Sequence, residues 1–128
     1  YSSGGGKVVV EGGTVTSEHG SGLVATGSST VEVTDGTVTV GSGQVAVMAH
    51  EGNATATISG GTVTAIGGNG AAGIGGGNNS SCGTITIADT VTSVTATKGE
   101  DAPNSIGAGK DGTCGTVTIE DPSKVTQN

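Results

Sequence analysis

Short strand patterns rich in Val and Ile, each followed by turn residues, run through the whole chain. They include residues 8–10, 31–33, 37–40, 85–87 and 117–119. Alternation of β-branched and polar residues with a period of two predicts strands rather than linkers. This pattern argues against disorder, although Gly and Ser are abundant.

A strand–turn–strand unit occurs five times, at 8–17, 31–40, 56–65, 84–96 and 117–126. Its turns fall at Gly12-Gly13, Asp35-Gly36, Gly60-Gly61, Asp89-Thr90 and Asp121-Pro122. Successive turns are separated by 35 − 12 = 23, 60 − 35 = 25, 89 − 60 = 29 and 121 − 89 = 32 residues. A third short segment lies between units, at 22–27, 44–49, 72–77 and 105–109.

Three short strands in each repeat predict an all-β fold, a right-handed parallel β-helix (solenoid) of about five three-strand coils without helices. We expect one β-helix domain over residues 1–128, interpreted as an excerpt of a longer chain. An antiparallel sandwich is the main alternative, but it does not explain a phrase repeated over one whole period. The expected inward side chains are Val8, Val10, Val15, Leu23, Val31, Val33, Val38, Val45, Val47, Ile58, Val63, Ile74, Ile85, Ile87, Val94, Ile106, Val117 and Ile119.

The clearest repeated phrase is GIGGGNNSSCGTITIAD at 73–89, which returns as SIGAGKDGTCGTVTIED at 105–121. Its cysteines are one period apart, since 114 − 82 = 32. On stacked coils the Cα atoms of Cys82 and Cys114 would be about 5 Å apart, which is within disulfide range. Two stacked reduced cysteines are the alternative, and a secreted setting favours the bridge.

The text SGGTVTAIGGNGAAGIGGG, followed by SCGTITI, resembles the glycine-rich repeats of secreted surface proteins from gut bacteria, especially Bacteroides-like ones. It is distantly similar to the β-helical carbohydrate-binding domains of bacterial extracellular proteins. The resemblance is close over residues 56–121 and loose over 1–55. It implies a right-handed β-helix that is secreted or at the cell surface, with calcium and polysaccharide contacts.

Composition excludes several partners. The net charge is −7, with four Lys and no Arg against eleven acidic residues, so nucleic acid and anionic membranes are not expected partners. No apolar run approaches the roughly 18 residues that a spanning helix needs, so membrane insertion is not expected.

We do not expect an enzyme. The nearest acidic pair, Glu32 and Asp35, is interpreted as a solvated face, and His19 and His50 as surface histidines in polar turns. Tyr1, the only aromatic residue, is expected at an untethered end and is a poor sugar platform.

Two further patterns suggest binding. Oxygen-bearing side chains in the later turns make Asp101, Asp111 and Asp121 candidate Ca²⁺ ligands, although solubilising charge is the favoured interpretation and no other cofactor is expected. Thr-Val-Thr occurs at 14–16, 37–39, 62–64, 90–92 and 116–118 (the fourth of these overlaps a turn). Inward valines would leave outward threonine ladders, formed by Thr14, Thr16, Thr37, Thr39, Thr62 and Thr64.

The favoured hypothesis is a non-catalytic extracellular structural or adhesive module. The alternative is a carbohydrate-binding module assisted by calcium, and the third hypothesis is ice binding through the threonine ladders, as on β-solenoid antifreeze proteins. Partners would be a surface polysaccharide or a protein. Because no cap is visible at either end, we also expect end-to-end self-association.

Overall fold

The computed structural model describes residues 1–41, 45, 47–50 and 53–128. The described residues form β-strands joined by turns and loops, with one short 3-10 helix, η1 (Pro122–Lys124), and no α-helix. The all-β class is therefore confirmed. Every pairing between the named strands is parallel, so the antiparallel sandwich is wrong for this part of the chain.

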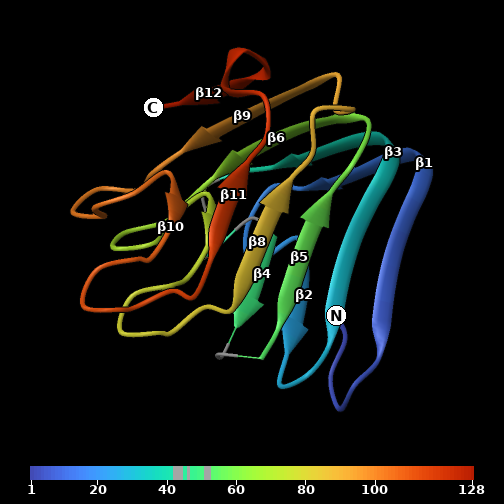
Figure 1. Cartoon of the computed structure of the whole chain (residues 1–128). Helices are drawn as coiled ribbons and strands as arrows, with labels where there is room; N and C mark the ends of the chain where they lie inside the picture. The colour runs from blue at the N-terminus through green and yellow to red at the C-terminus, as the bar shows by residue number, and fades with distance from the viewer. Residues whose placement is uncertain (42–44, 46, 51–52) are drawn as a thin grey trace.

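The strands form three stacks, and the first two are joined in one eight-stranded sheet (Figure 1). The first stack contains the N-terminal halves of β1 (Lys7–Ser17) and β3 (Thr30–Val40), followed by β5 (Thr55–Ile58), β8 (Thr84–Ile87) and β11 (Val117–Ile119). The second contains the C-terminal halves of β1 and β3, followed by β6 (Thr62–Ile66), β9 (Ser93–Thr97) and β12 (Val125–Gln127). β1 and β3 continue through the turn between the two stacks, where separate strands were expected.

The third stack is a separate four-stranded sheet. It contains β2 (Leu23–Thr26), β4 (Val47–His50), β7 (Ile74–Gly75) and β10 (Ile106–Gly107). β4 falls in the expected segment 44–49, of which residues 44 and 46 lie outside the described residues. Figure 1 shows long loops beside β10, where the chain enters and leaves this sheet.

The chain visits the stacks in the same order each time, and we call the strands from one pass a level. In chain order the five levels are β1–β2, β3–β4, β5–β7, β8–β10 and β11–β12. In the third stack the residue offset between neighbouring levels grows from 47 − 23 = 24 to 74 − 47 = 27 and then 106 − 74 = 32. The added residues lie mainly in the loops that flank the third stack, because β7 and β10 are only two residues long.

The core lies between the three stacks and consists of columns of small aliphatic side chains. Register aligns Val15, Val38, Val63, Val94 and Val125 in the second stack. Leu23, Val47, Ile74 and Ile106 align in the third. Val38, Val47, Val63 and Ile74 have no exposed surface, so the middle levels are fully packed.

Four of the expected inward side chains are less buried than expected. Val117 is 38% exposed, and Val8, Val15 and Ile119 are only partly buried. All four belong to the first or last level, which has a neighbouring level on one side only. The period-two pattern assigns the face of a strand, whereas burial also requires a neighbour above and below.

Glycine is required at the turn between the first two stacks. Gly61 has φ +75°, and a Cβ on it would collide with the carbonyl oxygen of Gly36 in the preceding level. Gly13 occupies the same turn in level 1 with φ +74°, but a Cβ on it would have no heavy atom within 4 Å. The two glycines thus have the same backbone strain and differ in crowding.

Substitutions of Gly13 and Gly61 distinguish the free-energy cost of backbone strain from that of steric crowding. Gly13→Ala should lower the free energy of unfolding by about 1–2 kcal/mol, because an L-residue is placed in the left-handed region. Gly61→Ala should cost at least about 1 kcal/mol more, because overpacking is added. Urea denaturation followed by circular dichroism measures both values. Equal costs would show that the levels are not in close contact at this turn.

Candidate functional site

The outward face of the second stack carries two columns of hydroxyl side chains. One column is Thr14, Thr37, Thr62 and Ser93, and the other is Thr16, Thr39, Thr64, Thr95 and Thr126. Thr14, Thr16, Thr37 and Thr39 are exposed, whereas Thr62 and Thr64 are half-buried. Paired strands lie about 4.8 Å apart, and alternate residues on a strand about 6.7 Å apart. The face is therefore a regular array of hydroxyl groups.

The array leaves the Thr-Val-Thr pattern after level 3. Residues 90–92 precede β9 and lie outside any strand, and Ser93 and Thr95 occupy the two columns instead. Residues 116–118 reach the first stack, where Thr118 pairs with Thr86. The turn between β8 and β9 is longer than the turn between β5 and β6. It therefore includes residues 90–92, and β9 begins only at Ser93.

The first stack is less uniform on its outward face. Thr30, Thr55 and Thr84 form one column, which begins at Lys7. The neighbouring column begins with Val9 and Glu32 before it continues as Thr57, Thr86 and Thr118. Lys7 and Glu32 form an ion pair across levels 1 and 2. The Glu32 carboxylate is thus paired with Lys7, whereas the Asp35 carboxylate accepts a hydrogen bond from the Gly36 N–H.

A disulfide with a Cα–Cα distance of 4.4 Å joins Cys82, in the loop between β7 and β8, to Cys114, in the loop between β10 and β11. The two residues also form a parallel bridge, and the Cys82 N–H donates to the Thr113 carbonyl at 2.8 Å. Cys82 is 2% exposed and belongs to the core cluster. Backbone hydrogen bonds thus align the two loops beside the third stack, and the disulfide joins them covalently.

The three candidate calcium ligands lie in separate surroundings. Asp101 and Asp111 occupy exposed turns with φ +64° and +56°, and Asp101 pairs with Lys110 at 3.7 Å. Asp121 caps η1, where the Ser123 hydroxyl donates to its carboxylate at 2.6 Å and lowers its pKa. Among the described residues no three His, Cys, Asp or Glu side chains are placed to hold a metal ion. The structure therefore does not gather Asp101, Asp111 and Asp121 into one metal-binding group.

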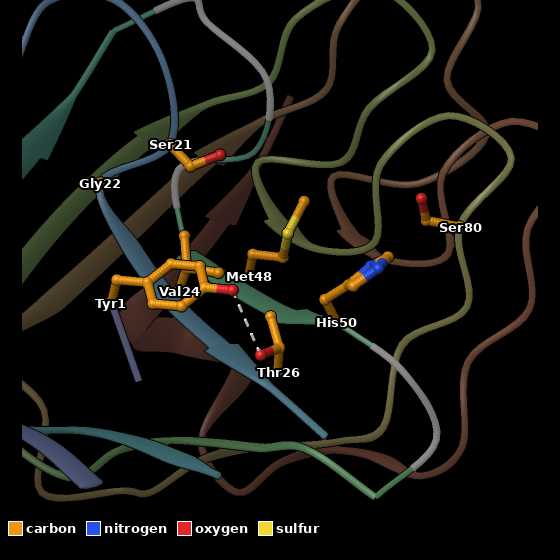
Figure 2. Close-up of a pocket in the computed structure, with 8 residues that line it drawn as sticks. All are labelled: Tyr1, Ser21, Gly22, Val24, Thr26, Met48, His50 and Ser80. Carbon is orange, nitrogen blue, oxygen red and sulfur yellow. Dashed lines mark hydrogen bonds between the residues drawn. The ribbon is translucent and has the colours of Figure 1, made fainter. Parts of the chain in front are cut away.

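A pocket of about 470 Å³ opens on the outward face of the third stack (Figure 2). Val24 and Thr26 of β2 and Met48 and His50 of β4 line it, and register pairs Val24 with Met48 and Thr26 with His50. Figure 2 shows Tyr1 at one side of this surface and Ser80 at the other. Ser21 and Gly22 complete the lining.

Tyr1 is held in place, which corrects the expectation of an untethered end. The Ser2 N–H donates to the Val24 carbonyl at 2.7 Å, and the Thr26 N–H donates to the Ser2 carbonyl at 2.9 Å. Ser2 thus extends the third stack beside β2. The Tyr1 hydroxyl lies 3.5 Å from the Thr26 hydroxyl, while 77% of the residue remains exposed. The backbone bonds position an accessible ring at the pocket.

His50 also differs from a free surface histidine. His50 is half-buried. In the described part of the chain, its Nδ1 is the one buried side-chain nitrogen or oxygen without a hydrogen-bond partner. An unpaired buried polar group costs about 1–3 kcal/mol. His19, by contrast, is exposed. The signal for this site in the sequence was the outward alternation of 24–26 and 48–50, but only register brings those residues together with residues 1 and 80.

Comparison of the chain with protein-family models, curated proteins and solved structures finds no match. No helix in the described ranges is long and apolar enough to cross a membrane. The described residues therefore show an all-β chain of stacked parallel strands, with a disulfide between two loops, a threonine face on the second stack and a pocket on the third.

Removal of the disulfide tests its contribution to the fold. The variant Cys82→Ala/Cys114→Ala should lose about 2–4 kcal/mol of unfolding free energy, because the unfolded chain gains the freedom of an open loop. Urea denaturation measures the loss, and the wild type in reductant is the matched comparison. A variant as stable as the oxidised wild type would contradict this role. Intact mass under non-reducing conditions checks that the purified chain is bridged.

Proposed function

We propose that the protein is a non-catalytic structural and adhesive module that acts outside the cell, built as a right-handed parallel β-helix. The observation that carries this proposal is the strand register, which continues through all five levels of the first two stacks. Such a chain is stiff along the stacking direction, because each level is held by its neighbours through backbone hydrogen bonds. Stiffness suits a spacer or a displayed surface.

Two further observations support this function. The disulfide between Cys82 and Cys114 is of a kind that persists in oxidising compartments such as the cell exterior. The charged side chains lie mostly in turns and at the outer levels, where they form ion pairs such as Lys7–Glu32 and Lys110–Asp101. A rigid, acidic surface of small residues is consistent with a module exposed to solvent and proteases.

Limited proteolysis tests the rigid-module proposal. Thermolysin should leave the oxidised chain uncut under native conditions, because cleavage needs a segment that has left the stacked levels. Reduction or the variant Cys82→Ala/Cys114→Ala should make cleavage faster, beginning near the loops at 76–83 and 108–116. Mass spectrometry identifies the cut sites. Rapid cleavage within β3, β6 or β9 of the oxidised chain would overturn the proposal.

A second candidate function is binding to a regular surface such as ice, through the face of the second stack. The specific observation in its favour is the pair of hydroxyl columns, in which Ser93 is the only residue other than Thr. The valines between the columns are on the inward face, and neither column contains a charged side chain. A repeated hydroxyl spacing can match a repeated spacing in a solid surface, whereas a single dissolved molecule would use little of it.

An ice-recrystallisation assay tests this candidate. The variants Thr39→Lys and Thr64→Lys should abolish any inhibition of crystal growth, since each places a hydrated charge within the array. Thr57→Lys is the matched control, because Thr57 has the same level and burial as Thr64 but belongs to the first stack. Equal loss in all three variants, or no inhibition by the wild type, would contradict ice binding through this face.

A further inference from the structure

The pocket on the third stack gathers side chains that are rare in this protein. The chain has 27 glycines but one Tyr, one Met and two His residues. Tyr1, Met48 and His50 all line the same pocket, although they come from two segments almost fifty positions apart. Tyr and Met offer large apolar contact surfaces, and Tyr and His can each donate and accept hydrogen bonds. Their convergence distinguishes the pocket from the rest of the surface.

The walls of the pocket are held by the fold. On one side Ser2 is hydrogen-bonded to the backbone of β2, which positions Tyr1. On the other side the loop 76–83 carries Ser80, and the bridge between His50 and Cys82 attaches this loop to β4. The disulfide from Cys82 to Cys114 holds the same loop to the next level. Hydrogen bonds and the disulfide therefore hold both walls of the pocket.

A gap in the outward column of the third stack lets the loop after β7 lie beside the pocket. Register places Gly75 beside Met48 and Gly107 beside Gly75, so the column loses its side chains after level 2. The loop after β7 covers this gap, and a Cβ on Gly77 would lie 3.5 Å from the Met48 Cε. The Met48 side chain therefore has the loop on one side and the open pocket on the other.

The described part of the lining is uncharged and combines apolar side chains with polar ones at the edge. Val24 and Met48 supply aliphatic and thioether surface, while Tyr1, Ser21, Thr26 and Ser80 supply hydroxyl groups. His50 adds a ring nitrogen that can donate or accept a hydrogen bond. Among the residues that the structure describes, the lining contains no Asp, Glu, Lys or Arg side chain. The net charge of −7 on the whole chain also disfavours an anion.

We propose that this pocket binds an uncharged sugar unit, with one face of the sugar ring against Tyr1 and Met48 and its hydroxyl groups bonded to the polar edge. A sugar ring has an apolar C–H face and a rim of hydroxyls that act as both donors and acceptors, which matches this lining. The volume lies within the range of about 300–1,000 Å³ that is usual for small-molecule sites. The site is independent of the threonine face and of the proposed structural function.

Titration by NMR tests the site with defined probes. Methyl glycosides of glucose, galactose, mannose and N-acetylglucosamine are added to the ¹⁵N-labelled full chain, with glucuronate as an anionic comparison. At least one neutral glycoside should cause saturable shifts at the amides of β2 and β4. Tyr1→Ala and His50→Ala should each weaken its binding about two- to tenfold, as the loss of a ring contact predicts.

Two variants serve as controls. Tyr1→Phe keeps the ring and should retain more binding than Tyr1→Ala. His19→Ala removes the other histidine, which is exposed and outside the pocket, and should bind as the wild type does. Circular dichroism melting checks that each variant folds.

Three results would overturn the proposal. The first is the absence of saturable shifts with every neutral glycoside. The second is binding that Tyr1→Ala and His50→Ala both leave unchanged. The third is glucuronate binding as tightly as the best neutral glycoside. None of them would alter the proteolysis result, so failure of this site is distinguishable from failure of the structural module.

Discussion

Parallel backbone pairing between levels, in register, is the constraint on which the rest of this structure depends. It sets each residue beside its counterpart in the next level, so that side chains of one kind form columns, such as the five valines from Val15 to Val125. A narrow core of Val, Ile and Ala suffices, because each buried side chain packs against counterparts above and below as well as across. Side chains in the first and last levels lack one of those neighbours, and Val117 is accordingly exposed.

The same pairing limits what the turns can contain. At the turn between the first two stacks the backbones approach so closely that a side chain at Gly61 would meet the Gly36 carbonyl. In the third stack Gly75 and Gly107 pair directly, both with positive φ. Added length lies outside the paired segments, mainly in the loops that flank β7 and β10 and also in the turn between β8 and β9. One pair of these loops carries the disulfide, and the earlier loop also forms a wall of the pocket.

Function, on this view, follows from where the outward columns are regular and where they are broken. The second stack is regular, and its threonines form a flat array. The third stack is broken, because the outward column changes from Val24 and Met48 to Gly75. The pocket lies beside that break, over β2 and β4, and Tyr1 and His50 are among its lining residues. A repetitive chain can thus carry one extended surface and one local site without any change of architecture.

Much of the fold could be predicted from the sequence, since period-two alternation determines which side chain of a strand faces inward, and the repeated phrase aligned Cys82 with Cys114. The threonines at 14–16, 37–39 and 62–64 follow from the same alternation. Only the tertiary structure decided the register of the longer levels, where Ser93 and Thr95 replace residues 90–92, and the separation of Asp101, Asp111 and Asp121. It alone revealed the pocket, because Tyr1, Met48, His50 and Ser80 are distant in sequence and meet through strand pairing and loop closure. Alternation is a local property of one strand, whereas a site depends on which strands become neighbours.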